Sequence, residues 1–235
     1  MPACLQTGSE QSHARRTGVC QRRNDVSAIL RREALHPMMD RPPQWHDIST
    51  FLPEQCTWIL DLGCGDGRTL ALCPKVPFRA GIDLDPTAID KARRVVREAH
   101  LCIGSAEALP YADETFDAIV SCVALPYVNI PIVLRECSRV LRRGGAIMLS
   151  VHSWDFLNLL WRRARPNLAG RAFRIYVTLN GLCFHFTGRL FSYPLKRCFM
   201  ESFQTDKRMV KALAAAGFQD VVKLPRPVSS FIAIR

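Results

Sequence analysis

Two acidic residues and three glycines lie close together in one short stretch of the sequence, and these residue types can hold a small charged ligand. The stretch covers residues 59–68 and reads ILDLGCGDGR, an apolar run followed by a glycine-rich segment. Glycine permits positive φ and lets a ligand approach the backbone closely. The pattern predicts a buried parallel strand that ends in a tight turn before a helix, which is a place where nucleotides and nucleosides bind.

The positions of the acidic residues indicate which kind of cofactor this turn would bind. The dinucleotide pattern G-x-G-x-x-G places a pyrophosphate at a helix N-terminus. Here Asp61 precedes the turn and Asp66 lies within it, and two carboxylates would repel a pyrophosphate. S-adenosylmethionine (SAM) carries sulfonium and ammonium groups and no phosphate, so it suits the turn better. The Gly-Lys-Ser/Thr ending of a phosphate-binding P-loop is absent.

Residues 57–151 resemble the core of class I SAM-dependent methyltransferases of the methyltransferase type 11 group. Five segments match in order: the glycine-rich turn, GIDLDP at 81–86, GSAEALPY at 104–111, FDAIVS at 116–121, and 136–150 with its LRRGGA sequence. The resemblance implies that the turn wraps the methionine part of SAM. It also implies that Asp83, at the end of the second strand, accepts hydrogen bonds from the ribose hydroxyls, and a carboxylate can accept two such bonds.

The resemblance further implies a set of cofactor-binding residues in the turn, at the end of the second strand, in the adenine segment and at the end of the fourth strand. They are Asp61, Gly63, Cys64, Gly65, Gly67, Asp83, Leu84, Ser105, Ala106, Glu107 and Cys122. Two positions depart from the family pattern. Ser105 stands where the family often has an aspartate that accepts from the adenine amino group, and a hydroxyl accepts more weakly. Residues 124–127 read ALPY where many members read Ala-Leu-His-His, so no histidine of that loop is available as a base.

Candidate catalytic residues are few. Methyl transfer from a sulfonium is an in-line displacement with a good neutral leaving group, so the enzyme mainly aligns the acceptor and excludes water. A base is needed only where the acceptor must lose a proton. The candidates are Tyr127, His152, His185 and Tyr193, and a packing role competes with catalysis for each. Of these, His152 directly follows the fifth strand and is expected to lie nearest to the site.

Strand and helix patterns alternate from Trp58 onward, which predicts a Rossmann-like α/β fold with helices on both faces of a mostly parallel sheet. Strands are expected at 58–62, 79–83, 101–104, 116–121 and 146–151, and helices at 67–73, 86–98 and 131–142, the last ended by Gly144-Gly145. A helix at 206–216, capped by Gly217, precedes strands at 218–224 and 228–234. The short link between these two strands requires the last strand to run antiparallel. This arrangement matches the seven-stranded sheet of the family, with order 3-2-1-4-5-7-6.

The chain divides into four predicted parts. Residues 1–24 are expected to be disordered, residues 25–56 to form a helical cover, and residues 57–151 with 206–235 to form the SAM-binding domain. Residues 152–205 are inserted before the last helix and contain 11 of the 20 aromatic residues and 8 lysines and arginines. A structureless loop of that length is uncommon in a compact domain. A helical lid over the carboxyl ends of the strands is therefore expected.

Charge and aromatic content favour particular partners. Residues 1–134 carry 14 basic and 16 acidic side chains, whereas residues 135–235 carry 18 and 5, so the second half favours anionic partners. Aromatics within the apolar runs of the insertion favour a small apolar acceptor, lipid-like or aromatic as in a quinone precursor. They also favour a peripheral contact of residues 152–205 with an anionic membrane surface. The alternatives are an RNA methyltransferase, for which nucleic acid is the less favoured partner, and a catalytically silent SAM-fold subunit.

The ten cysteines show neither a Cys-x-x-Cys pair nor zinc-ligand spacing, so no metal site is expected. Residues 1–25 are polar and lack the apolar region of a signal peptide. No apolar run reaches the roughly 18 residues of a membrane-spanning helix. The sequence therefore predicts a cytoplasmic protein with reduced thiols, which can lie at the periphery of a membrane.

Overall fold

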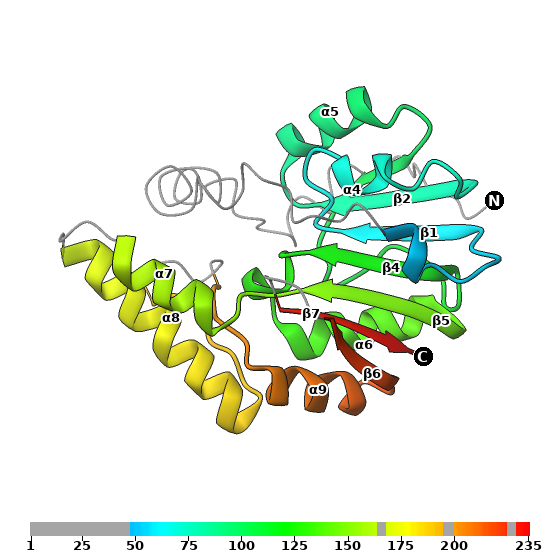
Figure 1. Cartoon of the computed structure of the whole chain (residues 1–235). Helices are drawn as coiled ribbons and strands as arrows, with labels where there is room; N and C mark the ends of the chain where they lie inside the picture. Colours follow the sequence, from blue (N-terminus) through cyan, green and yellow to red (C-terminus); the bar gives the residue numbers. More distant parts are fainter. Residues whose placement is uncertain (1–47, 164–167, 195–199, 225–228) are drawn as a thin grey trace.

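A seven-stranded sheet forms the centre of the computed structural model, which describes residues 48–163, 168–194, 200–224 and 229–235 (Figure 1). The strands are β1 (Trp58–Leu62), β2 (Phe78–Asp83), β3 (His100–Ile103), β4 (Phe116–Cys122), β5 (Leu141–Ser150), β6 (Gln219–Leu224) and β7 (Ser230–Ile234). Their order is β3-β2-β1-β4-β5-β7-β6. Strands β1 to β5 pair in parallel, and β7 runs antiparallel to β5 and β6. The predicted fold class and strand order are confirmed, whereas the segments predicted for residues 1–47 lie outside the described residues.

Helices cover both faces of the sheet. The helices of the described residues are the 3₁₀ helices η2 (Ile48–Phe51) and η3 (Leu125–Tyr127), and α4 (Arg68–Ala71), α5 (Pro86–Val95), α6 (Ile130–Val140), α7 (Trp154–Arg163), α8 (Leu168–Thr187) and α9 (Asp206–Ala215). Successive strand residues point to opposite faces. Ile59 and Ala118 pack in a cluster with side chains of η2 and α4, whereas Leu60 and Ile119 pack in a larger cluster with α6 and α9. The central strands β1 and β4 are therefore buried on both sides, as parallel strands require, whereas the edge strands β3 and β6 are more exposed.

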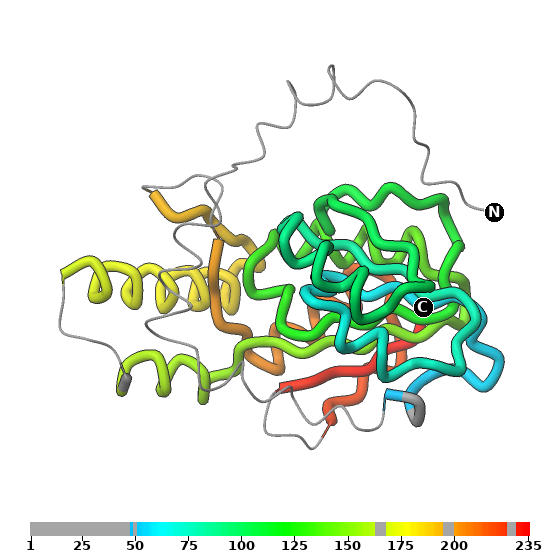
Figure 2. The backbone as a smooth tube through the Cα atoms, turned by 90° about the horizontal axis from the view of Figure 1, so that it is seen from above, coloured from blue at the N-terminus to red at the C-terminus, as the bar shows by residue number. Residues whose placement is uncertain are grey.

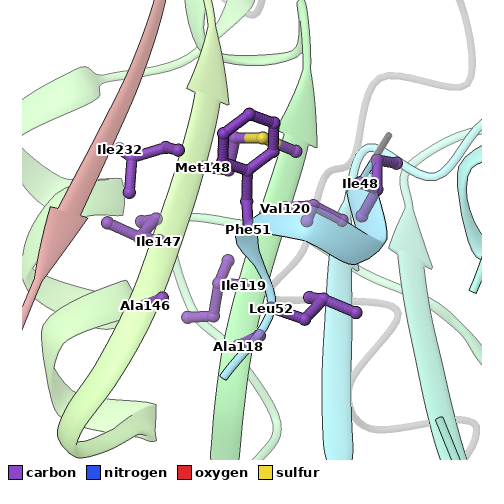
Figure 3. A pocket seen from close by; sticks show the side chains of 10 residues that line it. All are labelled: Ile48, Phe51, Leu52, Ala118, Ile119, Val120, Ala146, Ile147, Met148 and Ile232. Carbon is purple, nitrogen blue, oxygen red and sulfur yellow. The ribbon is translucent and has the colours of Figure 1, made fainter. Parts of the chain in front are cut away.

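A small apolar pocket lies beneath η2, against the middle of β4 and β5 (Figure 3). Its lining side chains are Ile48, Phe51, Leu52, Ala118, Ile119, Val120, Ala146, Ile147, Met148 and Ile232. Figure 3 shows the Phe51 ring above Met148. Ligands of open α/β sheets bind at the carboxyl ends of the strands, so this hydrophobic pocket in mid-sheet is part of the packing between η2 and the sheet.

The junction between α6 and β5 differs from the predicted one. The helix ends at Val140, and Gly144 and Gly145 lie inside β5 instead of ending the helix. Two carbonyls that would accept the next helical hydrogen bonds are already used: Glu114 N donates to Arg139 O at 3.0 Å and Thr115 N donates to Val140 O at 2.8 Å. Pairing with the segment that leads into β4 therefore stops the helix before its glycines are reached.

Residues between β5 and α9 form the helix pair α7 and α8, which extends beyond the carboxyl ends of β4 and β5 in both views (Figures 1 and 2). The two helices share an apolar core of their own, made of Phe156, Leu157, Leu160, Phe173, Tyr176, Val177 and Phe203. Many aromatics of the insertion are thus used in packing. None of the helices in the described part of the chain combines the length and apolar character needed to cross a membrane.

Candidate functional site

The glycine-rich turn between β1 and α4 is shaped by hydrogen bonds to β2. Gly63 N and Cys64 N both donate to the carbonyl of Ile82, at 2.8 and 3.1 Å. Gly63 has a φ of 69°, and a Cβ at this position would collide with the Cβ of Ala124 in the loop after β4. At Gly65 the φ is 53°, and among the described residues, apart from its chain neighbours, no atom lies within 4 Å of the place where a Cβ would be. The turn is tightly packed on one side and open on the other, where a ligand can reach its backbone.

Asp61 lies in β1 directly below this turn and is completely buried. Among the described residues neither of its carboxylate oxygens makes a hydrogen bond of ordinary geometry, although the Thr69 side chain is near enough to offset part of the effect of burial on the pKa. Burial raises the pKa of Asp61 to about 8, and the nearby Asp83 carboxylate contributes to the rise. A buried carboxylate without a partner is unfavourable, and a cation beside it removes the penalty. The site therefore fits a cofactor with a cationic group, as SAM has.

Asp83 ends β2 and faces the same turn. Its Oδ2 accepts from Gly65 N and its Oδ1 accepts from Asp85 N, both at 2.9 Å. Each carboxylate oxygen has further acceptor capacity, so Asp83 can hold the turn and still accept hydrogen bonds from a ribose. Leu84, the next residue, is partly exposed at the same end of the strand. The structure thus brings Asp61, Asp83 and the glycine turn together.

The segment predicted to meet the adenine uses its polar side chains locally. Ser105 Oγ accepts from Glu107 N at 3.1 Å, and Glu107 Oε1 accepts from Asn129 N at 2.8 Å. Since Asn129 immediately precedes α6, Glu107 holds the loop after β4 against the adenine segment. Ala106 packs against the main apolar cluster. Glu107 therefore has a structural role in addition to the predicted binding role.

The two cysteines among the predicted cofactor residues lie close to the strand ends. Cys64 is buried in the turn, and burial raises the pKa of its thiol. The thiol is therefore protonated at neutral pH. Cys64 is available to a bound cofactor through its backbone. Cys122 is the last residue of β4 and is partly buried.

His152 lies just beyond β5, next to Tyr127 of η3. Its ring stacks on Phe156 with centroids 3.6 Å apart and meets the Tyr127 ring edge-on at 5.4 Å. The Nδ1 atom of His152 is buried, has no hydrogen-bond partner among the described residues, and lies 3.9 Å from Glu201 Oε1. Burial lowers the pKa of His152 to about 3. The imidazole is therefore neutral at pH 7, and a pKa this low makes it a weak base in the unliganded protein.

The other two candidate bases have different surroundings. His185 Nδ1 and Thr205 Oγ1 lie 2.7 Å apart, where the end of α8 meets the start of α9. Tyr193 packs against the rings of Tyr176 and Phe173, at 4.9 and 6.2 Å, in the core of the α7–α8 pair. These contacts favour packing roles for His185 and Tyr193.

The sequence did not single out residues 201–204, which run between the strand ends and α8. Glu201, Ser202 and Gln204 are each no more than 2% exposed. On the side of the sheet, Ser202 N donates to Pro126 O at 3.1 Å and Gln204 N donates to His152 O at 2.7 Å. The segment thus places three buried polar side chains beside the candidate base.

On the other side, the same segment is fixed to α8 by two buried polar residues. Asn180 Nδ2 donates to Glu201 O at 2.9 Å, and Glu201 N donates to Tyr176 Oη at 3.1 Å. Asn180 Oδ1 also accepts from Phe191 N at 2.9 Å. This network connects the α7–α8 pair to the rim of the sheet. Within the described ranges, no group of three or more histidine, cysteine, aspartate or glutamate side chains is arranged to hold a metal ion.

Comparisons with known proteins agree with this geometry. A family model described as a methyltransferase domain matches residues 60–149. An uncharacterised methyltransferase of Mycobacterium tuberculosis is 30% identical over 131 residues, which cover 55% of this chain and 53% of the relative. A demethylmenaquinone methyltransferase of Thermotoga maritima is 28% identical over 172 residues, which cover 68% of this chain and 69% of the relative. The chain thus spans about half the length of the mycobacterial relatives that it matches.

Solved structures show the same architecture. The crystal structure of an S-adenosylmethionine-dependent methyltransferase from Mesorhizobium loti aligns with a TM-score of 0.60 and 18% identity, covering 84% of this chain and 100% of the other. At this level of identity the likeness concerns the fold.

Proposed function

Because residues 60–149 belong to the methyltransferase-domain family and the chain has the class I SAM-dependent fold, we propose that it binds SAM and transfers a methyl group to a small acceptor. The observation that carries the proposal is the buried carboxylate of Asp61, which makes no hydrogen bond of ordinary geometry among the described residues. It lies beneath a glycine turn that is open on one side. A sulfonium or ammonium group would supply the positive charge that balances this carboxylate.

The cofactor residues then have separate roles. The backbone of residues 63–67 surrounds the methionine part of SAM, and Asp61 balances its positive charge. Asp83 binds the ribose hydroxyls while it holds Gly65. The segment that begins at Ser105 borders the adenine, with backbone and apolar contacts more important than the Ser105 hydroxyl, which already accepts a hydrogen bond.

His152 is the proposed base for an acceptor that carries an O–H or N–H group. Bound SAM supplies an electrophilic methyl group, and the protein must align the acceptor and remove its proton. The neutral imidazole of His152 takes that proton only if the bound complex raises its pKa from about 3. The Glu201 carboxylate, 3.9 Å from Nδ1, then stabilises the imidazolium by charge, in the manner of an acid that orients a catalytic histidine.

We assign the acceptor to an apolar class, lipid-like or aromatic, with one polar group to be methylated. The rings of Phe156 and Tyr127 flank His152 and provide apolar surfaces beside the base. The Thermotoga relative, by its name, acts on demethylmenaquinone, an acceptor of this kind. Contact of residues 152–205 with a membrane would give the protein access to such an acceptor.

A radiolabel assay tests the proposal. The purified chain is incubated with methyl-labelled SAM and, in separate reactions, with demethylated quinols, simple hydroxyaromatic acids and total RNA. We expect label to appear in the organic extract of a quinol or hydroxyaromatic reaction. Label in the RNA would show the alternative substrate class, and SAM binding without transfer to any acceptor would indicate a silent subunit.

A further inference from the structure

The outer face of α8 carries an exposed apolar stripe. Leu168, Ile175, Leu179 and Phe186 are 84%, 49%, 54% and 76% exposed. Their spacing of seven, four and seven residues places them on one side of an α-helix. The opposite side of α8 is buried against α7 and the sheet, through residues such as Phe184. The helix is therefore apolar on two sides, and large side chains remain accessible on one of them.

The position of α8 leaves this stripe open to a large partner. Figures 1 and 2 show the α7–α8 pair projecting from the sheet, with α8 at the margin of the molecule. From Leu168 to Phe186 the stripe is about 27 Å long at 1.5 Å per residue. Such a length suits an extended flat surface more than a compact ligand.

Basic side chains accompany the stripe at one end. Arg171 is exposed one turn from Leu168, and Arg162 is exposed at the end of α7. Between Trp154 and Thr187 the sequence contains five arginines and a single acidic residue, Asp155. A partner that covers this face must therefore tolerate or prefer positive charge.

Arg174 adds positive charge to this face from a buried position. Its side chain is 7% exposed, its Nε has no hydrogen-bond partner in the described segments, and its guanidinium lies 5.3 Å from the centre of the Trp161 ring. An arginine keeps its charge when buried, and the Trp161 ring compensates only part of it. The buried guanidinium therefore adds to the positive potential of this face without reaching a ligand itself, and Trp161, at 46% exposure, is suited to the boundary between water and apolar chains.

We propose that the outer face of α8 docks on an anionic phospholipid surface. The helix lies parallel to the membrane, its apolar stripe enters the acyl boundary, and the exposed Arg171 and Arg162 contact the phosphates. The proposal does not rest on methyl transfer, because the surface exists without SAM.

Two other occupants fit the face less well. A second copy packed through the same face would offer these arginines a single acidic side chain between residues 154 and 187, Asp155, as a partner. RNA would meet the arginines, but three of the four stripe residues, Leu168, Ile175 and Leu179, are aliphatic, so Phe186 is the one stripe residue with a ring on which a base can stack.

Co-sedimentation with lipid vesicles tests the proposal. The full chain is mixed with vesicles of phosphatidylcholine, or of phosphatidylcholine with phosphatidylglycerol, at physiological salt. We expect binding to the anionic vesicles, weakened about tenfold or more by the double change Ile175→Glu and Leu179→Glu, since both side chains would carry charge into the acyl boundary. Arg171→Gln should weaken binding to the anionic vesicles and reduce its salt dependence.

Val222→Glu is the matched control, because Val222 is 55% exposed on β6, away from α8, and should bind vesicles like the unchanged chain. Circular dichroism and SAM calorimetry show that each variant is folded and binds cofactor. Equal vesicle binding by the stripe variant and the unchanged chain would overturn the proposal. So would preferential RNA binding in a gel-shift assay, or a dimer that dissociates when Ile175 and Leu179 are changed.

Discussion

Burial shifts the pKa values of Asp61 and His152 in opposite directions: it favours a bound cation beside Asp61, and it keeps His152 neutral but weakly basic. It raises the pKa of Asp61 to about 8 and lowers that of His152 to about 3, because an apolar environment disfavours the charged form of each. Without cofactor, Asp61 is therefore close to its titration point at neutral pH. A bound cation would favour its ionised form, so SAM binding and deprotonation of Asp61 are coupled.

The first prediction concerns the pH dependence of stability. The pKa of Asp61 is about 8 in the folded chain against an ordinary value of 3.8, so the folded state holds a proton that the unfolded state releases. Without SAM, the free energy of unfolding should fall as the pH rises from about 4 to about 8. The fall should be smaller for Asp61→Asn, as measured by urea unfolding at pH 5 and pH 8. Identical pH dependence in the two proteins would show that Asp61 does not carry this burial penalty.

The second prediction concerns His152. With an acceptor that carries an O–H or N–H group, His152→Gln should lower kcat by a factor of about 10² to 10⁴, while the SAM affinity stays within about twofold because His152 is not among the proposed cofactor residues. Glu201→Gln should lower kcat less and shift its pH profile. His185→Gln is the control and should retain kcat. An unchanged kcat in His152→Gln would remove the proposed base.

The sequence pointed to the residues of the glycine turn and missed those near His152. The turn and Asp61 follow a local pattern, and the family resemblance adds Asp83, which the structure places against the turn. Glu201 contacts His152 across 49 positions of sequence, and Asn180 fixes its backbone from a different helix. Polar and apolar residues of 201–204 are all buried, so no hydrophobic alternation marks the segment.

At the scale of elements, a glycine in α8 allows this helix to lie close to residues 201–204. A Cβ at Gly181 would collide with the ring of Phe203, which belongs to the core of the α7–α8 pair. A small residue is therefore required where the helix meets the buried segment.

The third prediction follows from this contact. In a solvent-exposed helix, Gly→Ala stabilises by about 1 kcal/mol. At Gly181 we expect the opposite sign, a loss of about 1–3 kcal/mol in the free energy of unfolding, since Phe203 must move within a packed core. Urea unfolding of Gly181→Ala provides the measurement, and a gain in stability would contradict the described packing.

Element boundaries were the least accurate part of the sequence prediction. The α6 helix ends at Val140 because Thr115 N takes the carbonyl of that residue, a contact that depends on the approach of a distant loop. Gly144 and Gly145 resemble a helix end in sequence and yet belong to β5. Strands such as β1, with four consecutive buried residues, were predicted closely because their apolar runs are a local property.

At the scale of the whole molecule, the strand order could be predicted because the alternating pattern and the family resemblance agree. The direction of the α7–α8 pair could not be predicted, because aromatic content indicates that side chains are buried but does not show which helix faces meet. The apolar stripe on α8 and the burial of Arg174 against Trp161 emerge only from that arrangement. The boundaries of the four predicted parts and the cytoplasmic location stay predictions.

Titration calorimetry of SAM into the purified chain tests the central claim most directly. We predict binding at a single site, and an affinity at least about tenfold lower for Asp83→Ala, which corresponds to about 1.4 kcal/mol. Asp85→Ala is the matched control: Asp85 caps α5 by accepting from Thr87 N, so its loss should lower stability and leave SAM affinity unchanged. A folded chain that takes up no SAM, or an Asp83→Ala variant that binds it as tightly as the unchanged protein, would contradict the account.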